Sequence, residues 1–174
     1  MIICAGNNET FDFATPMGVG LIDTAMNVTR LCLFDKPEFL LFVGTAGSYG
    51  SAKVMDVIAS KTAANIELSF LQKHSYTPIN NIISAQTEDK KDVIVNSSNY
   101  ITTDALLASR FEALGIGLEN MEFFSVLRVA QEFGISAGGI FCVTNYCNEN
   151  AHEDFIKNHH AAKAKLTEYI KKRF

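Results

Sequence analysis

Residues 39–47 read Phe-Leu-Leu-Phe-Val-Gly-Thr-Ala-Gly, a continuous apolar run that stops at a glycine. An apolar run without alternation is typical of a strand that is buried on both faces of a sheet. Residues 139–144, Gly-Ile-Phe-Cys-Val-Thr, form a second run of this kind, whereas residues 21–33 have the apolar spacing of a helix. Buried strands that alternate with helices predict an α/β fold with a parallel or mixed sheet covered on both faces.

The remaining elements are predicted by the same patterns. Short apolar or alternating segments predict strands at residues 1–5, 11–15, 54–60, 82–85 and 93–95. Helical spacing predicts helices at residues 103–113, with Thr103 as N-cap, at 118–133, ended by Gly134, and at 151–172. Ligands of such sheets bind beyond the carboxyl ends of the strands. The loop Gly44–Gly47 and the pair Thr144-Asn145 are therefore expected to meet in one crevice.

Composition narrows the class of protein. A chain of 174 residues predicts one domain, and its net charge of −4 without a basic face argues against a nucleic-acid partner. No apolar run approaches the ~20 residues that cross a bilayer, and no leader pattern begins the chain, so we expect a cytoplasmic protein without membrane contact. The four cysteines form no CxxC pair, and His159-His160 lie in a Lys-rich helical stretch typical of a solvated face. We therefore expect no metal and no organic cofactor.

Two polar residues stand in apolar surroundings. Glu122 lies in Met-Glu-Phe-Phe, and a carboxylate there must be paired or exposed. It is either a salt-bridge partner of Arg128 or Arg110, or an acceptor for sugar hydroxyls. Asn145 follows a buried strand, where it either caps the strand end or hydrogen-bonds to a purine edge. The residues alone leave both pairs of alternatives open.

Two glycine-rich segments are predicted to be loops, one before the helix at 21–33 and one after the strand at 39–43. Gly18-Val19-Gly20 stands between a predicted strand and a helix, where it is either a tight turn or an anion site at a helix N-terminus. Gly44-Thr45-Ala46-Gly47 follows a buried strand. Its amides and hydroxyl could hold a phosphate or a sugar oxygen, and the alternative is a turn that packs against a helix.

The order of these motifs resembles the nucleoside phosphorylase and nucleosidase superfamily, from about residue 13 to the C-terminus. The matching segments are Gly-Val-Gly before a helix, Gly-Thr-Ala-Gly after a strand, Ser-Ser-Asn-Tyr-Ile at 97–101, Glu-Asn-Met-Glu at 119–122 and Thr-Asn at 144–145. The similar branches are small bacterial purine nucleoside phosphorylases, methylthioadenosine nucleosidases and futalosine hydrolases. The resemblance implies a three-layer sandwich whose central mixed, twisted sheet is flanked by helices, in a single domain (1–174) that is shortened at the N-terminus.

The resemblance also implies a role for individual residues. Glu122 binds the ribose hydroxyls, with Met121 under the sugar and Asn120 beside it. Tyr100 stacks on the base together with Ile101. Asn145 occupies the place where nucleosidases carry an Asp that protonates purine N7. Gly20 and Thr45 match positions near the phosphate or the nucleophilic water. Glu9 is either the water-activating glutamate or the turn residue of a hairpin, and we favour the hairpin.

The implied activity is cleavage of the N-glycosidic bond of a purine nucleoside. We expect a phosphorylase that prefers a 6-oxopurine, with inorganic phosphate as co-substrate, because an Asn cannot act as a general acid. However, Phe42 stands where phosphorylases carry an Arg, and the only early arginine is Arg30. The alternatives are therefore a water-dependent nucleosidase of the methylthioadenosine or futalosine type, a nucleoside-binding module without catalysis, or an unrelated α/β protein. The resemblance further implies a homo-oligomer, with His74-Ser75-Tyr76 as a loop donated to a partner or as an ordinary surface loop.

Overall fold

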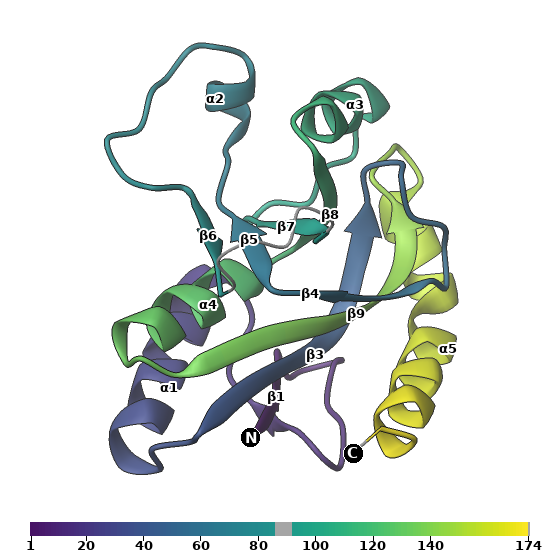
Figure 1. Cartoon of the computed structure of the whole chain (residues 1–174). Coiled ribbons are helices and arrows are strands. Elements are labelled where there is room, and N and C mark those ends of the chain that lie inside the picture. The colour runs from purple at the N-terminus through teal and green to yellow at the C-terminus, as the bar shows by residue number, and fades with distance from the viewer. Residues whose placement is uncertain (86–91, 174) are drawn as a thin grey trace.

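The computed structural model describes residues 1–85 and 92–173 (Figure 1). The strands are β1 (Ile2–Cys4), β2 (Thr15–Pro16), β3 (Phe39–Ser48), β4 (Val57–Ser60), β5 (Thr62–Ala64), β6 (Ile82–Ser84), β7 (Ile94–Ser97), β8 (Ile116–Asn120) and β9 (Ser136–Tyr146). The helices are α1 (Leu21–Phe34), α2 (Leu68–Leu71), α3 (Ala105–Ala113), α4 (Phe123–Glu132) and α5 (Ala151–Lys171). These elements give the α/β fold that the sequence predicts.

The strands named above belong to one mixed sheet. Its order is β2-β1-β3-β8-β7-β5-β6, and β9 pairs with β3 and with β4. The pairs β3–β8, β4–β9 and β5–β6 are antiparallel, and the others are parallel. One edge of β3 pairs with β1 at Leu41 and Phe42 and with β8 at Gly47 and Ser48, so the backbone between these points has no strand partner on that edge.

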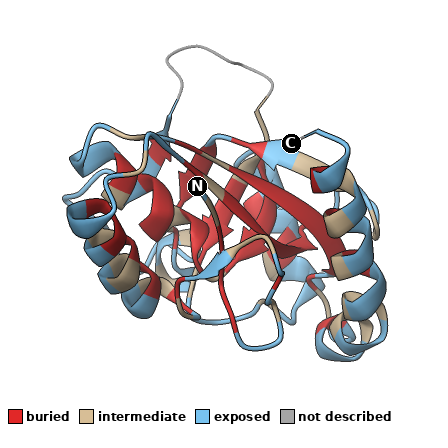
Figure 2. Cartoon of the chain, turned by 90° about the horizontal axis from the view of Figure 1, so that it is seen from below, coloured by how far each residue is buried: buried red, intermediate tan, exposed pale blue. Residues whose placement is uncertain are grey.

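Two apolar cores lie on opposite faces of β3, because successive side chains of a strand point to opposite faces. Leu40 and Phe42 pack in the core beneath α1 and α4, whereas Val43 packs in the core beneath α5. Figure 1 shows α1 and α4 on one side of β3 and β9 and α5 on the other, and Figure 2 shows the buried strands between helices whose outer faces are exposed. The three-layer arrangement is therefore confirmed. None of the helices in the described ranges is long and apolar enough for a membrane span.

The prediction of one helix over residues 118–133 is wrong. Residues 116–120 form β8, which pairs with β7 and β3, and α4 begins only at Phe123. No glycine or proline separates the strand from the helix, so apolar spacing alone does not mark where β8 ends and α4 begins. Residues 119–122 therefore comprise the last two residues of β8 and the two residues that connect β8 to α4.

Other predicted boundaries also need correction. Gly44–Gly47 is not a loop, because β3 continues through it with a bulge at Ala46/Gly47. The N-cap of α3 is Asp104, whose carboxylate accepts from two backbone N–H groups, and not Thr103. Of the segment at 11–15 only Thr15 belongs to a strand, the strand expected at 54–60 begins at Val57, and the sequence pattern does not predict β5 or α2. Short elements of this kind depend on partners elsewhere in the chain, which local patterns do not encode.

Candidate active site

A cavity of about 330 Å³ opens where β3, β8 and β9 end. Its wall comes from Thr45–Gly47 of β3, from Glu119–Glu122, from Thr144 and Asn145 of β9, and from the turn after β1. The predicted meeting of Gly44–Gly47 with Thr144-Asn145 is therefore confirmed. Three carboxylates, those of Glu9, Glu119 and Glu122, line this one cavity, and the described residues that line it include no Lys or Arg.

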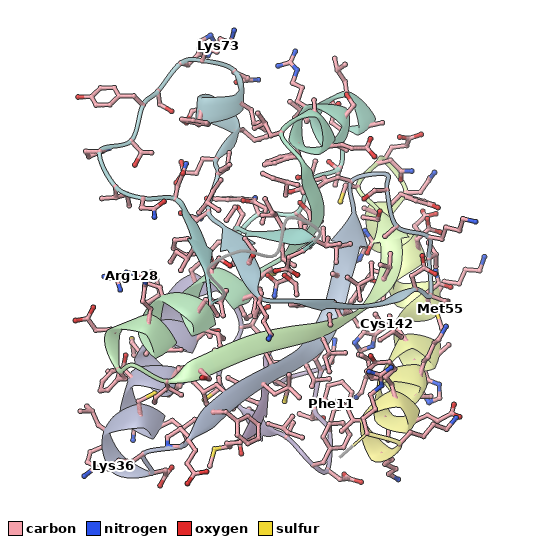
Figure 3. All side chains as sticks on the ribbon, in the orientation of Figure 1. Phe11, Lys36, Met55, Lys73, Arg128 and Cys142 are labelled. Atoms are coloured by element: carbon pink, nitrogen blue, oxygen red, sulfur yellow. The ribbon has the colours of Figure 1, made fainter. Side chains whose placement is uncertain are left out.

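Glu122 is buried between α4 and the start of α1. One carboxylate oxygen accepts from the Gly20 N–H at 3.0 Å, and the other accepts from the Met121 N–H at 3.2 Å and from Asn120 Nδ2 at 3.3 Å. The salt-bridge alternative is wrong, because Arg128 pairs with Glu132 on the outer side of α4 (Figure 3) and Arg110 is exposed on α3. Burial raises the pKa of Glu122 to about 7, and the negative charge of Glu9 adds to this rise. Two backbone N–H groups and the Asn120 amide thus hold the carboxylate at the cavity, and no cationic side chain of the described residues pairs with it.

The raised pKa of Glu122 makes stability depend on pH. The folded protein binds this proton more tightly than the unfolded chain, so the contribution is complete below pH 4.5 and is lost as the pH rises through about 7. We expect Glu122→Gln to flatten the fall in unfolding free energy between pH 4.5 and pH 8 by up to about 3 kcal/mol. Urea unfolding at a series of pH values measures the slope. Glu132→Gln, at an exposed carboxylate, is expected to keep the wild-type slope, and an unchanged slope in Glu122→Gln would contradict the prediction.

Asn145, Gly47 and Glu119 form one row across three strands. Gly47 pairs with Asn145 on β9 and with Glu119 on β8. A Cβ atom at Gly47 would lie 2.9 Å from Cys147 Sγ, 3.1 Å from Asn145 Nδ2 and 3.3 Å from Glu119 Cγ, so these three side chains converge over the bare glycine. Asn145 Oδ1 accepts from the Thr144 hydroxyl at 2.8 Å, and its Nδ2 donates to the Tyr146 carbonyl at 3.1 Å. These local bonds fix the orientation of the amide at the cavity wall.

Glu119 is a buried acceptor that the sequence analysis did not single out. It accepts from the Tyr49 hydroxyl at 2.8 Å and from the Thr102 N–H at 3.0 Å. Burial raises the pKa of its carboxyl, and the hydrogen bonds from Thr102 and Tyr49 oppose that rise. Since Thr102 closely follows Tyr100 and Ile101, Glu119 also anchors the segment that carries them. Both of these residues line the cavity, and Tyr100 is 83% exposed at its rim.

Glu9 stands on the turn Gly6–Glu9, whose ends pair by a backbone bridge. The turn was predicted, but the Glu9 side chain also faces the cavity and accepts from the Thr45 N–H and hydroxyl. That N–H lies on the stretch of β3 between its pairings with β1 and β8. Burial raises the pKa of Glu9, and the hydrogen bonds from Thr45 oppose the rise. Thr45 therefore orients Glu9 within the cavity.

His159 of α5 is also placed beside Glu9, with Nε2 at 3.8 Å from Glu9 Oε1. Its side chain is only 14% exposed, so the prediction of a solvated face for the pair at 159–160 is wrong for His159, although it holds for the exposed His160. The helical spacing of Phe155, His159 and Ala162 was the available signal, because it places His159 on the apolar face of α5.

The other predicted features lie as follows. Arg30 is exposed on α1 and does not line the cavity. Residues 74–76 are exposed beyond α2, and their contribution to a partner subunit stays a prediction. All four cysteines are buried and free. Across residues 1–85 and 92–173, no cluster of His, Cys, Asp and Glu could hold a metal ion.

Comparison with known proteins gives the same fold. The family model described as the phosphorylase superfamily matches residues 2–173. A Helicobacter pylori MTAN mutant, with aspartate replaced by asparagine and 5′-methylthioadenosine in the active site, superposes with TM-score 0.78 at 16% identity, covering 91% of this chain and 78% of that one. Native futalosine hydrolase of H. pylori gives TM-score 0.78 at 17% identity, covering 91% and 76%. Streptococcus pneumoniae MTA/SAH nucleosidase with 8-aminoadenine gives TM-score 0.77 at 13% identity, covering 97% and 95%.

The search of curated proteins found no match. The family match nevertheless spans nearly the whole chain, and the superposed structures share its mixed sheet between helices. The chain therefore belongs to the phosphorylase superfamily, the superfamily of nucleoside phosphorylases and nucleosidases.

Proposed function

We propose that this protein hydrolyses the N-glycosidic bond of a purine nucleoside, with water as the nucleophile. The observation that carries the proposal is the convergence of Glu9, Glu122 and Asn145 on one cavity. Hydrolysis breaks the bond from C1′ to the purine nitrogen and forms a bond from C1′ to the water oxygen. The water gives one proton to Glu9 and keeps the other in the new hydroxyl at C1′, while the purine leaves as an anion and takes a proton from solvent. A positive sugar and a negative base develop together, and buried carboxylate and amide groups at fixed positions stabilise that charge separation.

Glu122 serves as the anchor for the ribose. Its contact with Asn120 Nδ2 is long at 3.3 Å, so a sugar hydroxyl replaces it at little cost. Met121 then packs under the sugar, and Asn120 lies beside it. The N–H groups of Gly20 and Thr45 already donate to Glu122 and Glu9. We therefore assign to these two residues the positioning of carboxylates around the nucleophile.

Water rather than phosphate is the nucleophile that suits this cavity. A phosphate needs cationic or multiple N–H partners, whereas the described residues of the wall include three carboxylates, no Lys or Arg, and a single imidazole, that of His152. Negative side chains repel a phosphate anion but activate a neutral water molecule as general bases. The superposed nucleosidases and futalosine hydrolase support the same preference at the level of fold.

The row of Asn145, Gly47 and Glu119 supports a 6-oxopurine as the leaving base. Such a base carries acceptors at N7 and O6 and a donor at N1–H. Asn145 supplies an amide donor for N7, and the Glu119 carboxylate supplies an acceptor for N1–H. An adenine would place its N1 lone pair against that carboxylate, which costs affinity because two acceptors meet. Tyr100 and Ile101 cover the face of the base.

The decisive experiment incubates the protein with inosine and with 5′-methylthioadenosine, each with and without phosphate. We expect release of free base and free sugar at the same rate in both conditions, with inosine the better substrate of the two. Phosphate-dependent release, with sugar 1-phosphate as product, would replace hydrolysis by phosphorolysis. Hypoxanthine binding without any cleavage would indicate a binding module instead.

Asn145→Asp is expected to change the preference for the base. Glu119 lies across Gly47, so its negative charge raises the pKa of an aspartate at position 145 and keeps it protonated. A protonated carboxyl is a general acid for N7, so cleavage of adenosine relative to inosine rises by about 10- to 100-fold. The ratio of kcat/KM values for the two nucleosides measures the change. Asn148→Asp retains the oxygen that accepts from the Asn150 N–H, outside the cavity, and serves as the matched control. An unaltered ratio in Asn145→Asp would refute the role of Asn145 at N7.

A further inference from the structure

His159 carries a buried nitrogen that no part of the proposed reaction uses. Its Nε2 atom is inaccessible to solvent and, within the described ranges, has no hydrogen-bond partner. Buried polar groups in folded proteins are nearly always paired, because an unpaired one costs a desolvation penalty that nothing offsets. The atom lies 3.8 Å from Glu9 Oε1, slightly beyond hydrogen-bond length. The Glu9 side chain itself is 15% exposed and ends in the cavity.

The surroundings hold His159 in this place. Its ring packs against Phe155, one turn earlier on α5, with centroids 4.7 Å apart. Lys163, one turn later, donates to the Asn8 carbonyl at 2.9 Å and lies over the ring of Phe11, which faces α5 (Figure 3). Lys163 therefore holds the chain against α5 on both sides of Glu9, at Asn8 and at Phe11, one helical turn from His159.

The charged groups around the pair favour a neutral imidazole. Burial, Lys163 and His160 lower the pKa of His159. The positive charge of Lys163 lowers the pKa of Glu9 and so favours its charged form. The negative charge of Glu9 in turn raises the pKa of Glu122 and the pKa of Cys4. A neutral imidazole with its hydrogen on Nε2 is a donor, and Glu9 is the acceptor that faces it.

We propose that His159 is a positioning residue for Glu9: when the nucleophilic water is bound, its Nε2–H donates to the Glu9 carboxylate and keeps that carboxylate ionised and turned toward the water. The inference rests on the proposed hydrolysis and adds to the same site a residue that contacts Glu9 rather than the substrate. Thr45 holds Glu9 from the side of β3, and His159 holds it from the side of α5. The proton of the water passes to Glu9, whereas His159 retains its own.

The test compares His159→Leu with His159→Gln. Leucine keeps the bulk and removes the donor, so kcat is expected to fall about 10- to 100-fold with KM nearly unchanged. The acidic limb of the kcat profile is expected to move up by about one pH unit, because Glu9 loses a hydrogen bond to its ionised form. The melting temperature rises by about 2–4 °C, since a buried polar atom without a partner is removed. Glutamine restores an N–H donor at similar reach and is expected to restore both kcat and the position of the acidic limb.

Lower activity together with higher stability is a signature that a merely structural role would not give. Lys157→Leu changes an exposed residue of α5 that does not line the cavity and serves as the control, with kcat unchanged. His159→Leu with wild-type kcat and an unmoved acidic limb would overturn the inference while leaving hydrolysis intact. The titration of the Glu9 carboxyl, followed by carbon-13 NMR and assigned with Glu9→Gln, needs no turnover. A pKa of Glu9 that rises in His159→Leu supports the pairing even if no nucleoside is cleaved, and a pKa that stays in place rejects it.

Discussion

Glu9→Gln is expected to lower kcat for nucleoside hydrolysis by about 10³-fold, within the range found for general-base catalysis. The glutamine keeps the shape of the side chain and can still accept from the Thr45 N–H, but it cannot take a proton from water. Because burial raises the pKa of Glu9 above its usual range, the wild-type rate should rise with pH as this carboxyl ionises. The variant should lose that dependence. Release of free base, followed across a pH series, measures both effects.

Binding of the base separates this loss from misfolding. Glu9 lies on the turn after β1, whereas Asn145 and Glu119 lie over Gly47 on the sheet. Glu9→Gln should therefore bind hypoxanthine with close to wild-type affinity in calorimetry. Glu149→Gln, at an exposed carboxylate outside the cavity, should behave as wild type in both assays. Full activity in Glu9→Gln would remove Glu9 from the mechanism.

The second large effect is expected from Glu122→Gln, with kcat/KM for ribonucleosides about 10³-fold lower. A hydrogen bond to a charged acceptor contributes roughly 1.5–3 kcal/mol, and two sugar hydroxyls donate to this buried carboxylate, which together accounts for the expected loss. The NH2 group of glutamine also faces the Met121 N–H or the Gly20 N–H, and because both groups are donors, that backbone N–H loses its acceptor. The substitution thus weakens both the sugar contact and the support behind it.

A substrate change isolates the sugar contact. If Glu122 acts through the ribose hydroxyls, the fold loss in kcat/KM caused by Glu122→Gln should be much smaller for a 2′,3′-dideoxynucleoside than for the ribonucleoside. The ratio of the two fold losses in kcat/KM gives the coupling between the side chain and the substrate hydroxyls, as in a double-mutant cycle. Glu132→Gln, at the exposed partner of Arg128, supplies the control. Equal costs for the two substrates would show that Glu122 supports the fold of the site and does not bind the sugar.

The order of the main elements and the chemistry of several site residues could be predicted from the sequence. The runs at 39–43 and 139–144 are buried strands because their side chains are apolar on both faces and both faces must be shielded from water. The local pattern of apolar residues is enough to show this. The helix after Gly20 and the helix that begins at Ala151 follow from apolar spacing in the same way. Glu122 and Asn145 stood out because a carboxylate or an amide in an apolar segment requires a partner. These are properties of a residue and its neighbours in the chain.

Only the tertiary structure decided which side chains meet. Glu119 joins Asn145 because β8 and β9 both align with Gly47, and that register is set by pairing between distant segments. Glu9 reaches the cavity because β3 changes its neighbour from β1 to β8 and leaves the Thr45 N–H for a side chain to bind. His159 faces Glu9 because α5 packs across the sheet onto the turn after β1. Local periodicity specifies which face of an element is buried, but the distance between two such faces depends on the packing of the whole domain.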